Sequence, residues 1–202
     1  FVAFTDLGED ASAAALAAGK FSADLPPGLV QDRPNSTAAN NGANTLFQVV
    51  SQDPSISGFV NSSQALQGMG LLAARHFEKV ESARLLTASE YTVNTRLGFI
   101  SLNQSLNNDE VLAVAYQYTL DGQTYQVGQF AQDGAFPTDD PSTPDQPQTG
   151  PQGTEALILR LLKATITNPR IPLWDLMMKN IYSLGAFQVN RDNFRLDLLY
   201  NN

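Results

Sequence analysis

The sequence predicts an α+β fold, with a mainly antiparallel sheet and two helices packed on one of its faces. The first observation is a hairpin signal over residues 111–131, where alternating apolar side chains flank an Asp-Gly pair. The second is the helical spacing of apolar residues in two segments, at about 154–166 and 172–184. The third is the order of these elements, because strands grouped before helices are typical of α+β rather than α/β proteins.

The hairpin has the sharpest signal in the chain. Asp121 and Gly122 separate its two strand-like runs, and a two-residue turn favours Asp-Gly because it needs positive φ at both positions. The register that follows from this turn places opposite each other Leu120 and Gln123, Tyr118 and Tyr125, and Tyr116 and Val127. One face of the hairpin then carries three tyrosines, and each cross-strand pair contributes about 0.2–1 kcal/mol.

The two predicted helices have start and stop signals. Thr154 is placed to cap the first helix and Glu155 lies at its positive end, while leucines recur along it. Pro172 suits the first turn of the second helix, and Gly185 is placed to end it. Trp174 lies on the second helix beside two methionines, which suggests either core packing or a docking face, and core packing is the simpler interpretation.

The chain divides by composition into two regions. Residues 1–76 are rich in Ala, Asn, Ser and Gly. We expect them to be irregular apart from a short helix at 10–19, and to be either a separate segment or part of the same domain. Residues 77–202 are the predicted α+β domain, with a proline-rich flexible loop at 132–153. Its other strand-compatible segments are residues 77–86, 91–102 and 194–200.

Composition argues against several kinds of partner. The net charge of −8 is unsuited to nucleic acid, whose sequence-independent binding depends on Lys and Arg, and to anionic lipid surfaces. No stretch approaches the roughly 20 apolar residues of a spanning helix, so we expect no direct membrane insertion. The chain has no cysteine, which removes disulfides and thiolate chemistry. It starts at Phe1, without a methionine or a basic n-region, and we expect it to be a piece of a longer protein.

Few residues are suited to catalysis. His76 is the only histidine, which weakens any Ser-His-Asp or histidine-ligated metal proposal. Asp109 and Glu110 are more typical of a solvated turn than of a glycosidase dyad, and the aspartates of the 132–153 loop lack EF-hand spacing. We therefore predict no catalytic residue, no cofactor and no metal. The candidate residues for interaction or packing are Tyr116, Tyr118, Tyr125 and Trp174.

Three blocks of the sequence resemble the SprA/Sov family of gliding-motility and secretion proteins. The blocks are residues 78–106, residues 109–128, and residues 172–184 together with 194–200. The most specific string begins at Trp174 and reads Trp-Asp-Leu-Met-Met-Lys-Asn. The resemblance is to a repeated amino-terminal-type soluble domain of these proteins, and residues 1–70 take no part in it.

The resemblance implies a non-catalytic role in the type IX secretion system. Members of the family are giant outer-membrane β-barrels through which folded cargo leaves the cell. This chain would then be a soluble domain outside the barrel wall, in the bacterial cell envelope. The implied partners are the remainder of the parent barrel chain, other secretion-system components and transported cargo. The motifs do not distinguish the periplasmic from the extracellular side, nor gating from cargo guidance or bracing of the barrel.

Two other classes of function compete with this one. A carbohydrate- or peptide-binding surface module would use the hairpin tyrosines. An exposed aromatic row beside a groove would favour it, and burial beneath the helices would exclude it. Docking through the Trp174 region would be excluded if both Met177 and Met178 were buried. A hydrolase is disfavoured by the lone histidine and by the lack of any catalytic motif.

Overall fold

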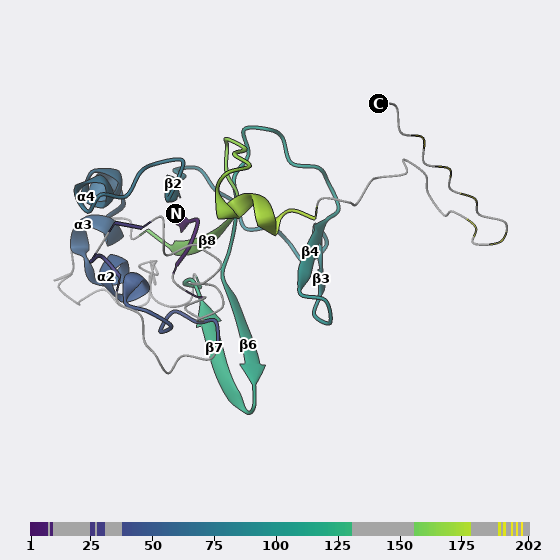
Figure 1. Ribbon diagram of the computed structural model, residues 1–202, viewed down its shortest axis with the longest axis horizontal. Helices are drawn as coiled ribbons and strands as arrows, with labels where there is room; N and C mark the ends of the chain where they lie inside the picture. The colour runs from purple at the N-terminus through teal and green to yellow at the C-terminus, as the bar shows by residue number, and fades with distance from the viewer. Residues whose placement is uncertain are drawn as a thin grey trace, which may run out of the picture.

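The computed structural model contains a central sheet, two hairpins and several short helices (Figure 1). The residues that it describes are 1–7, 9, 25, 26, 28–30, 38–130, 156–178, 190, 192, 195, 197 and 199. Within these ranges, no helix has both the length and the apolar character needed to cross a membrane.

The central sheet has the strand order β2-β1-β8-β5. In that order, the strands span Phe77–Lys79, Val2–Phe4, Ile158–Lys163 and Leu112–Val114. β1 pairs antiparallel with β2 and parallel with β8, while β8 pairs antiparallel with β5. The prediction of an α+β fold with mostly antiparallel pairing is therefore confirmed.

β1 and β8 form the middle of the sheet, which is covered on both faces. Val2 and Phe4 point to one face, where they join a hydrophobic cluster with Ile158 and the short helices. Ala3 points to the opposite face and joins a second cluster with Leu161. This alternation follows from the two-residue period of a strand. Both clusters combine the first residues of the chain with residues after position 155, so they join its two compositional regions.

Three short α-helices and a 3-10 helix lie on the face of the sheet that carries Phe4. They are α2 (Leu46–Gln52), α3 (Pro54–Ser57), η2 (Phe59–Asn61) and α4 (Ser62–Gly68). Asp53 caps α3 by accepting a hydrogen bond from Ser55 N, and Pro54 occupies its first position. The expectation that residues 1–76 are irregular is wrong for residues 46–68, which form these helices. The helices were not predicted because each is too short to show a periodic apolar stripe.

Neither predicted helix has the expected form. The helix at about 154–166 is wrong, because Ile158–Lys163 form β8. A strand covered on both faces is a nearly continuous apolar run, and leucines in so short a run fit helical spacing equally well. The helix at 172–184 is reduced to the 3-10 helix η4, Pro172–Leu176, with residues 179–184 outside the described residues. η4 packs through Leu173 on the face opposite to α2–α4, so the helices do not share one face.

Two hairpins form separate two-stranded sheets. The first pairs β3 (Tyr91–Asn94) with β4 (Phe99–Leu102), and the second pairs β6 (Tyr116–Leu120) with β7 (Gln123–Val127). Figure 1 shows the β6–β7 hairpin projecting from the body of the protein. Residues 111–131 do not form one continuous hairpin, because the chain turns away at Ala115 and β5 pairs with β8 instead of with the residues after β7.

Some of the remaining sequence predictions concern described residues, and the others concern residues outside them. β2 lies within the segment 77–86, and β3 and β4 lie within 91–102. Three predicted features lie outside the described residues. They are the short helix at 10–19, the loop at 132–153, and the strand at 194–200 apart from residues 195, 197 and 199.

Candidate functional site

The tyrosines of the β6–β7 hairpin lie together on one face. Tyr118 stacks against Tyr125 on the opposite strand, with ring centroids 5.4 Å apart. It also stacks against Tyr116 on its own strand, at 6.3 Å, and both pairs of rings are inclined by 28°. Tyr116 is 36% exposed, and the other two are half-buried. We call Tyr116, Tyr118 and Tyr125 the tyrosine row.

The segment before α2 is tied to this hairpin by hydrogen bonds. Tyr118 Oη donates to Ala39 O (2.7 Å), and Asn41 N donates to Gln126 O (2.8 Å). Asn41 also binds Gly128 twice, since its Nδ2 donates to Gly128 O (3.0 Å) and its Oδ1 accepts from Gly128 N (2.8 Å). Asn41 therefore lies along the outer edge of β7, where a third strand would begin.

Replacing Tyr118 by Phe is expected to lower the free energy of unfolding by about 0.5–1.5 kcal/mol. The ring stays stacked, and only the hydrogen bond to Ala39 O is lost. Urea denaturation measures the change. Tyr125→Phe is the matched control on the opposite strand, and we expect a change within about 0.5 kcal/mol. Equal losses in the two variants would show that the Tyr118 hydroxyl does not hold the segment before α2.

A groove of about 390 Å³ lies beside the tyrosine row. It is lined by Asn40, Asn41, Phe47, Thr124, Tyr125, Gln126 and Gln129. None of these described lining residues carries a formal charge at neutral pH, and their amides offer both donors and acceptors. Each of the four amides already makes a hydrogen bond within the protein. Gln129 Oε1, for example, accepts from Ile158 N (2.9 Å), and Asn40 Nδ2 donates to Ala38 O (2.7 Å). The groove is thus neutral and polar, with aromatic rings on its wall.

Trp174 lies on another element, η4. Its backbone N donates to Ile171 O (3.0 Å) and its side chain is half-buried, while Leu173 before it is buried in the second core cluster. Met177 and Met178, which follow η4, are 48% and 50% exposed. The burial that would exclude docking is therefore not observed. The structure brings the three tyrosines together, whereas it places Trp174 on an element that packs against β8.

Of the residues considered for catalysis, His76 and Glu110 make hydrogen bonds to the backbone. His76 is buried, and its Nδ1 accepts a hydrogen bond from Leu72 N (2.9 Å). Asp109 and Glu110 are exposed at a turn, where Glu110 Oε2 accepts a hydrogen bond from Asn107 N (2.7 Å). Among the described residues, no group of three or more His, Cys, Asp or Glu side chains could hold a metal ion. The aspartates of the 132–153 loop lie outside that part of the chain.

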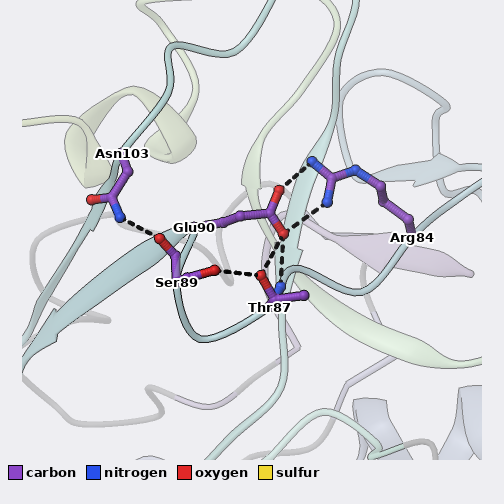
Figure 2. A network of polar contacts seen from close by, with 5 residues as sticks. All are labelled: Arg84, Thr87, Ser89, Glu90 and Asn103. Carbon is purple, nitrogen blue, oxygen red and sulfur yellow. Dashed lines mark hydrogen bonds and ion pairs between the residues drawn. The ribbon is translucent and has the colours of Figure 1, made fainter.

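Two ion-pair clusters among the described residues were not predicted from the sequence, and the first of them precedes β3. Figure 2 shows Glu90 accepting contacts from both terminal nitrogens of Arg84, at 2.7 and 2.9 Å. Thr87 adds hydrogen bonds from its backbone N (2.8 Å) and its hydroxyl (3.0 Å) to Glu90 Oε2. Ser89 and Asn103 extend the network toward the end of β4. The Thr-x-x-Glu spacing is the signal that could have found it, because this spacing lets the carboxylate reach back to the Thr N–H.

The pKa of Glu90 is lowered from 4.5 to about 2, first by the hydrogen bond from Arg84 and then by those from Thr87. A depressed folded-state pKa means that the cluster stabilises the fold fully above pH 4.5 and loses this contribution as the pH falls toward 2. The Glu90 carboxyl carbon, followed by NMR, should therefore titrate near pH 2, and Arg84→Gln should move that midpoint toward 4.5. A midpoint above 4 in the unaltered protein would show that the cluster does not form in solution.

The second cluster is a buried ion pair. Arg160 on β8 donates from Nε to Glu9 Oε1, and the two side chains are 4% and 10% exposed. Arg160 Nη1 also donates to Leu161 O (2.7 Å) and Phe4 O (3.3 Å), while Glu9 Oε2 accepts from Leu7 N (2.7 Å). An arginine inside an apolar run is expected to be buried, and a buried charge is costly unless it forms an ion pair. Because the partner is 151 positions away, no local pattern identifies it.

Comparison with known proteins adds no relative, since no protein-family model and no curated protein matches the chain. Geometry alone therefore defines the candidate site. It consists of the tyrosine row, the groove beside it, and the exposed side chains of Leu176, Met177 and Met178, which follow Trp174 in the sequence. All three are suited to non-covalent contact with a partner through apolar and neutral polar groups.

Proposed function

We propose that the chain is a non-catalytic, soluble domain of a giant outer-membrane β-barrel translocon that exports folded proteins in type IX secretion and gliding motility. The single observation that carries this proposal is the resemblance of three sequence blocks to the SprA/Sov family, above all the string that begins at Trp174. The proposed partners are the rest of the parent barrel chain, other secretion-system components and transported cargo. The proposed location is the bacterial cell envelope, at the outer membrane.

The positions of these blocks in the fold support a role in assembly. The first block contains the β3–β4 hairpin, the second contains the β6–β7 hairpin, and the third begins with η4. All three elements, or the residues next to them, expose large apolar side chains, namely Val93, Leu97, Ile100, Leu120, Leu176, Met177 and Met178. An isolated two-stranded hairpin is only marginally stable, and apolar side chains gathered on its surface suit packing against further protein.

The β6–β7 hairpin is part of the proposed contact surface. Asp121 and Gly122 at its tip have φ values of 51° and 76°, the left-handed conformation that a two-residue hairpin turn needs. Leu120, next to the tip, is 47% exposed. A turn of this kind holds the exposed end of the hairpin in a defined shape, which suits a surface that meets a partner.

The test is export of a signal-bearing cargo by cells whose parent protein lacks residues 1–202. Deleting only residues 77–202 would take β2 and β8 away from β1 and expose Phe4, so the whole chain is the correct unit to remove. We expect the cargo to stay inside while the shortened parent reaches the outer membrane at its usual level. Normal export by the deletion strain would overturn the translocon proposal.

Surface variants distinguish contact from folding. The double change Val93→Ser and Leu97→Ser alters two side chains of the β3–β4 hairpin that are 51% and 71% exposed. Val60→Ser alters a side chain on η2 that is 82% exposed and lies outside the three blocks. Export should fall with the double variant and stay normal with Val60→Ser. Equal export by the two strains would remove the β3–β4 hairpin from the contact surface.

A second candidate function is a carbohydrate- or peptide-binding surface module that uses the tyrosine row. The observation that favours it is the groove beside Tyr125, because an aromatic row next to a groove is the arrangement such a module needs. None of the three rings is buried in the core. Binding of a neutral peptide or oligosaccharide to the purified chain tests this function, and binding of neither would reject it.

A further inference from the structure

We propose that the groove beside β7 binds an uncharged, extended peptide segment, which pairs as an added strand with the outer edge of β7 at Thr124. This inference rests on the second candidate function and names its ligand. Strand addition of this kind takes its affinity from main-chain hydrogen bonds and its selectivity from pockets for alternate side chains.

The main chain of Thr124 points away from β6. Leu120 and Gln123 flank a two-residue turn and exchange hydrogen bonds, so the next pair, Thr119 and Thr124, is of the non-hydrogen-bonded type. In such a pair, the N–H and C=O groups of both residues point to the outer edges of the hairpin. Gln126 repeats this orientation two residues later, and its carbonyl oxygen does accept an outside hydrogen bond, from Asn41 N at 2.8 Å.

Asn41 begins a ladder of hydrogen bonds, and none of the described residues continues it at Thr124. Its backbone N binds Gln126 O, and its side-chain amide reproduces strand pairing by donating to and accepting from the backbone of Gly128. The segment around Asn41 thus covers the edge of β7 at Gln126 and Gly128. Thr124 is exposed and lines the groove next to this segment. A peptide strand in the groove would extend the ladder by one further residue pair, toward the tip of the hairpin.

Gly128 makes the covered part of the edge possible. Its φ is +78°, and a Cβ atom there would lie 3.1 Å from Ala115 Cβ and 3.3 Å from Ile158 O. The chain therefore turns sharply from β7 toward β8 at this position, and Gln129 N donates to Ile158 O (2.8 Å). The edge of β7 that an added strand could use therefore ends at Gly128, and its exposed part lies toward the hairpin tip, at Thr124.

The lining of the groove selects a neutral ligand. None of its described lining residues carries a charge, so neither a phosphate nor a metal ion would find a counter-charge there. Phe47 and Tyr125 provide apolar surface for a side chain. The four lining amides already make hydrogen bonds within the protein, so the main chain of Thr124 is the group that would bind the peptide. The volume of about 390 Å³ is within the range of small-ligand sites, about 300–1,000 Å³.

The tyrosine row favours a peptide over a sugar. Carbohydrate sites present the open face of an aromatic ring, whereas Tyr125, the tyrosine that lines the groove, is stacked against Tyr118. Part of its ring faces is therefore already covered by protein. A free strand edge, by contrast, has donors and acceptors at the spacing of an extended polypeptide.

The test uses the 202-residue chain labelled with ¹⁵N and a probe peptide of five alternating threonine and valine residues, with both ends blocked. We expect amide shift changes gathered at Asn40, Asn41 and residues 123–129, together with slower hydrogen exchange of the Thr124 N–H. Thr124→Pro removes that N–H and should weaken binding tenfold or more. Thr119→Pro is the matched control, because it removes the equivalent outward N–H on the opposite edge of the hairpin, and binding should be unchanged.

A probe peptide methylated on alternate nitrogens tests the same hydrogen bonds without altering the protein, and it should also bind at least tenfold more weakly. Equal binding of the plain and methylated peptides, or shift changes on another surface, would overturn the proposal. If cellohexaose shifts the groove resonances and the peptide does not, the binding-module function stands and the peptide inference is wrong. If neither probe binds at millimolar concentration, both are wrong.

Discussion

Arg160→Met should lower the free energy of unfolding by about 3–5 kcal/mol, the usual cost of removing one partner from a buried ion pair. Arg160 and Glu9 are 4% and 10% exposed, so the substitution leaves the Glu9 carboxylate in the core without its guanidinium partner. The carbonyl oxygens of Phe4 and Leu161 would also lose a donor. Urea denaturation followed by circular dichroism measures the loss.

Adding Glu9→Gln to Arg160→Met should restore part of that stability. The double variant has no unpaired charge in the core, and the Gln side-chain oxygen can still accept the hydrogen bond from Leu7 N. The comparison between the two variants measures the cost of the unpaired carboxylate alone. A loss below about 1 kcal/mol for Arg160→Met would mean that the pair is solvated in the native protein.

Phe4→Ala should cost about 3–5 kcal/mol, as expected for truncating a large aromatic residue in a packed core. Phe4 is 1% exposed, and its ring centroid lies 6.3 Å from that of Phe77 across the β1–β2 pair. Val60→Ala, at a side chain that is 82% exposed, is the control and should change stability by no more than about 0.5 kcal/mol.

The same variant tests whether the regions on either side of residue 76 fold as one unit. Phe4 belongs to the first region and Phe77 to the second, and both lie in the same core cluster. We therefore expect a single unfolding transition that shifts as a whole when Phe4 is truncated, with helix and tyrosine signals changing together. Two separate transitions, of which only one moves, would show that the regions unfold independently.

Local sequence patterns predicted those features that depend on neighbours within a few residues. The α+β class followed from the hairpin signal, from helical spacing in two segments and from the order of these elements. The structure confirms the class, although the first of those two segments contains a strand and not a helix. The segments 77–86 and 91–102 do contain strands. The facing of Tyr118 and Tyr125 is a local property of the same kind, because a two-residue turn and a period of two determine which side chains meet.

The misassigned element shows where local patterns fail. Ile158–Lys163 contains enough leucines to fit a helical stripe, yet it lies between β1 and β5 and is covered on both faces. Covering both faces removes the polar alternation by which an exposed strand is recognised. β1 was missed for a related reason, because a strand of three residues has too little sequence to show a period, and its partner β8 lies at the far end of the chain.

The features of the candidate site also separate into those that local sequence patterns predicted and those that depend on tertiary contacts. The sequence alone determined that three tyrosines share a face of one hairpin, because alternation along a strand is a local rule. Only the tertiary structure decided that Asn41 and Phe47 form the other side of a groove and that Glu9 pairs with Arg160. These contacts join residues about 80 to 150 positions apart. They arise because burial of the shared core brings distant segments together, which no pattern within one segment encodes.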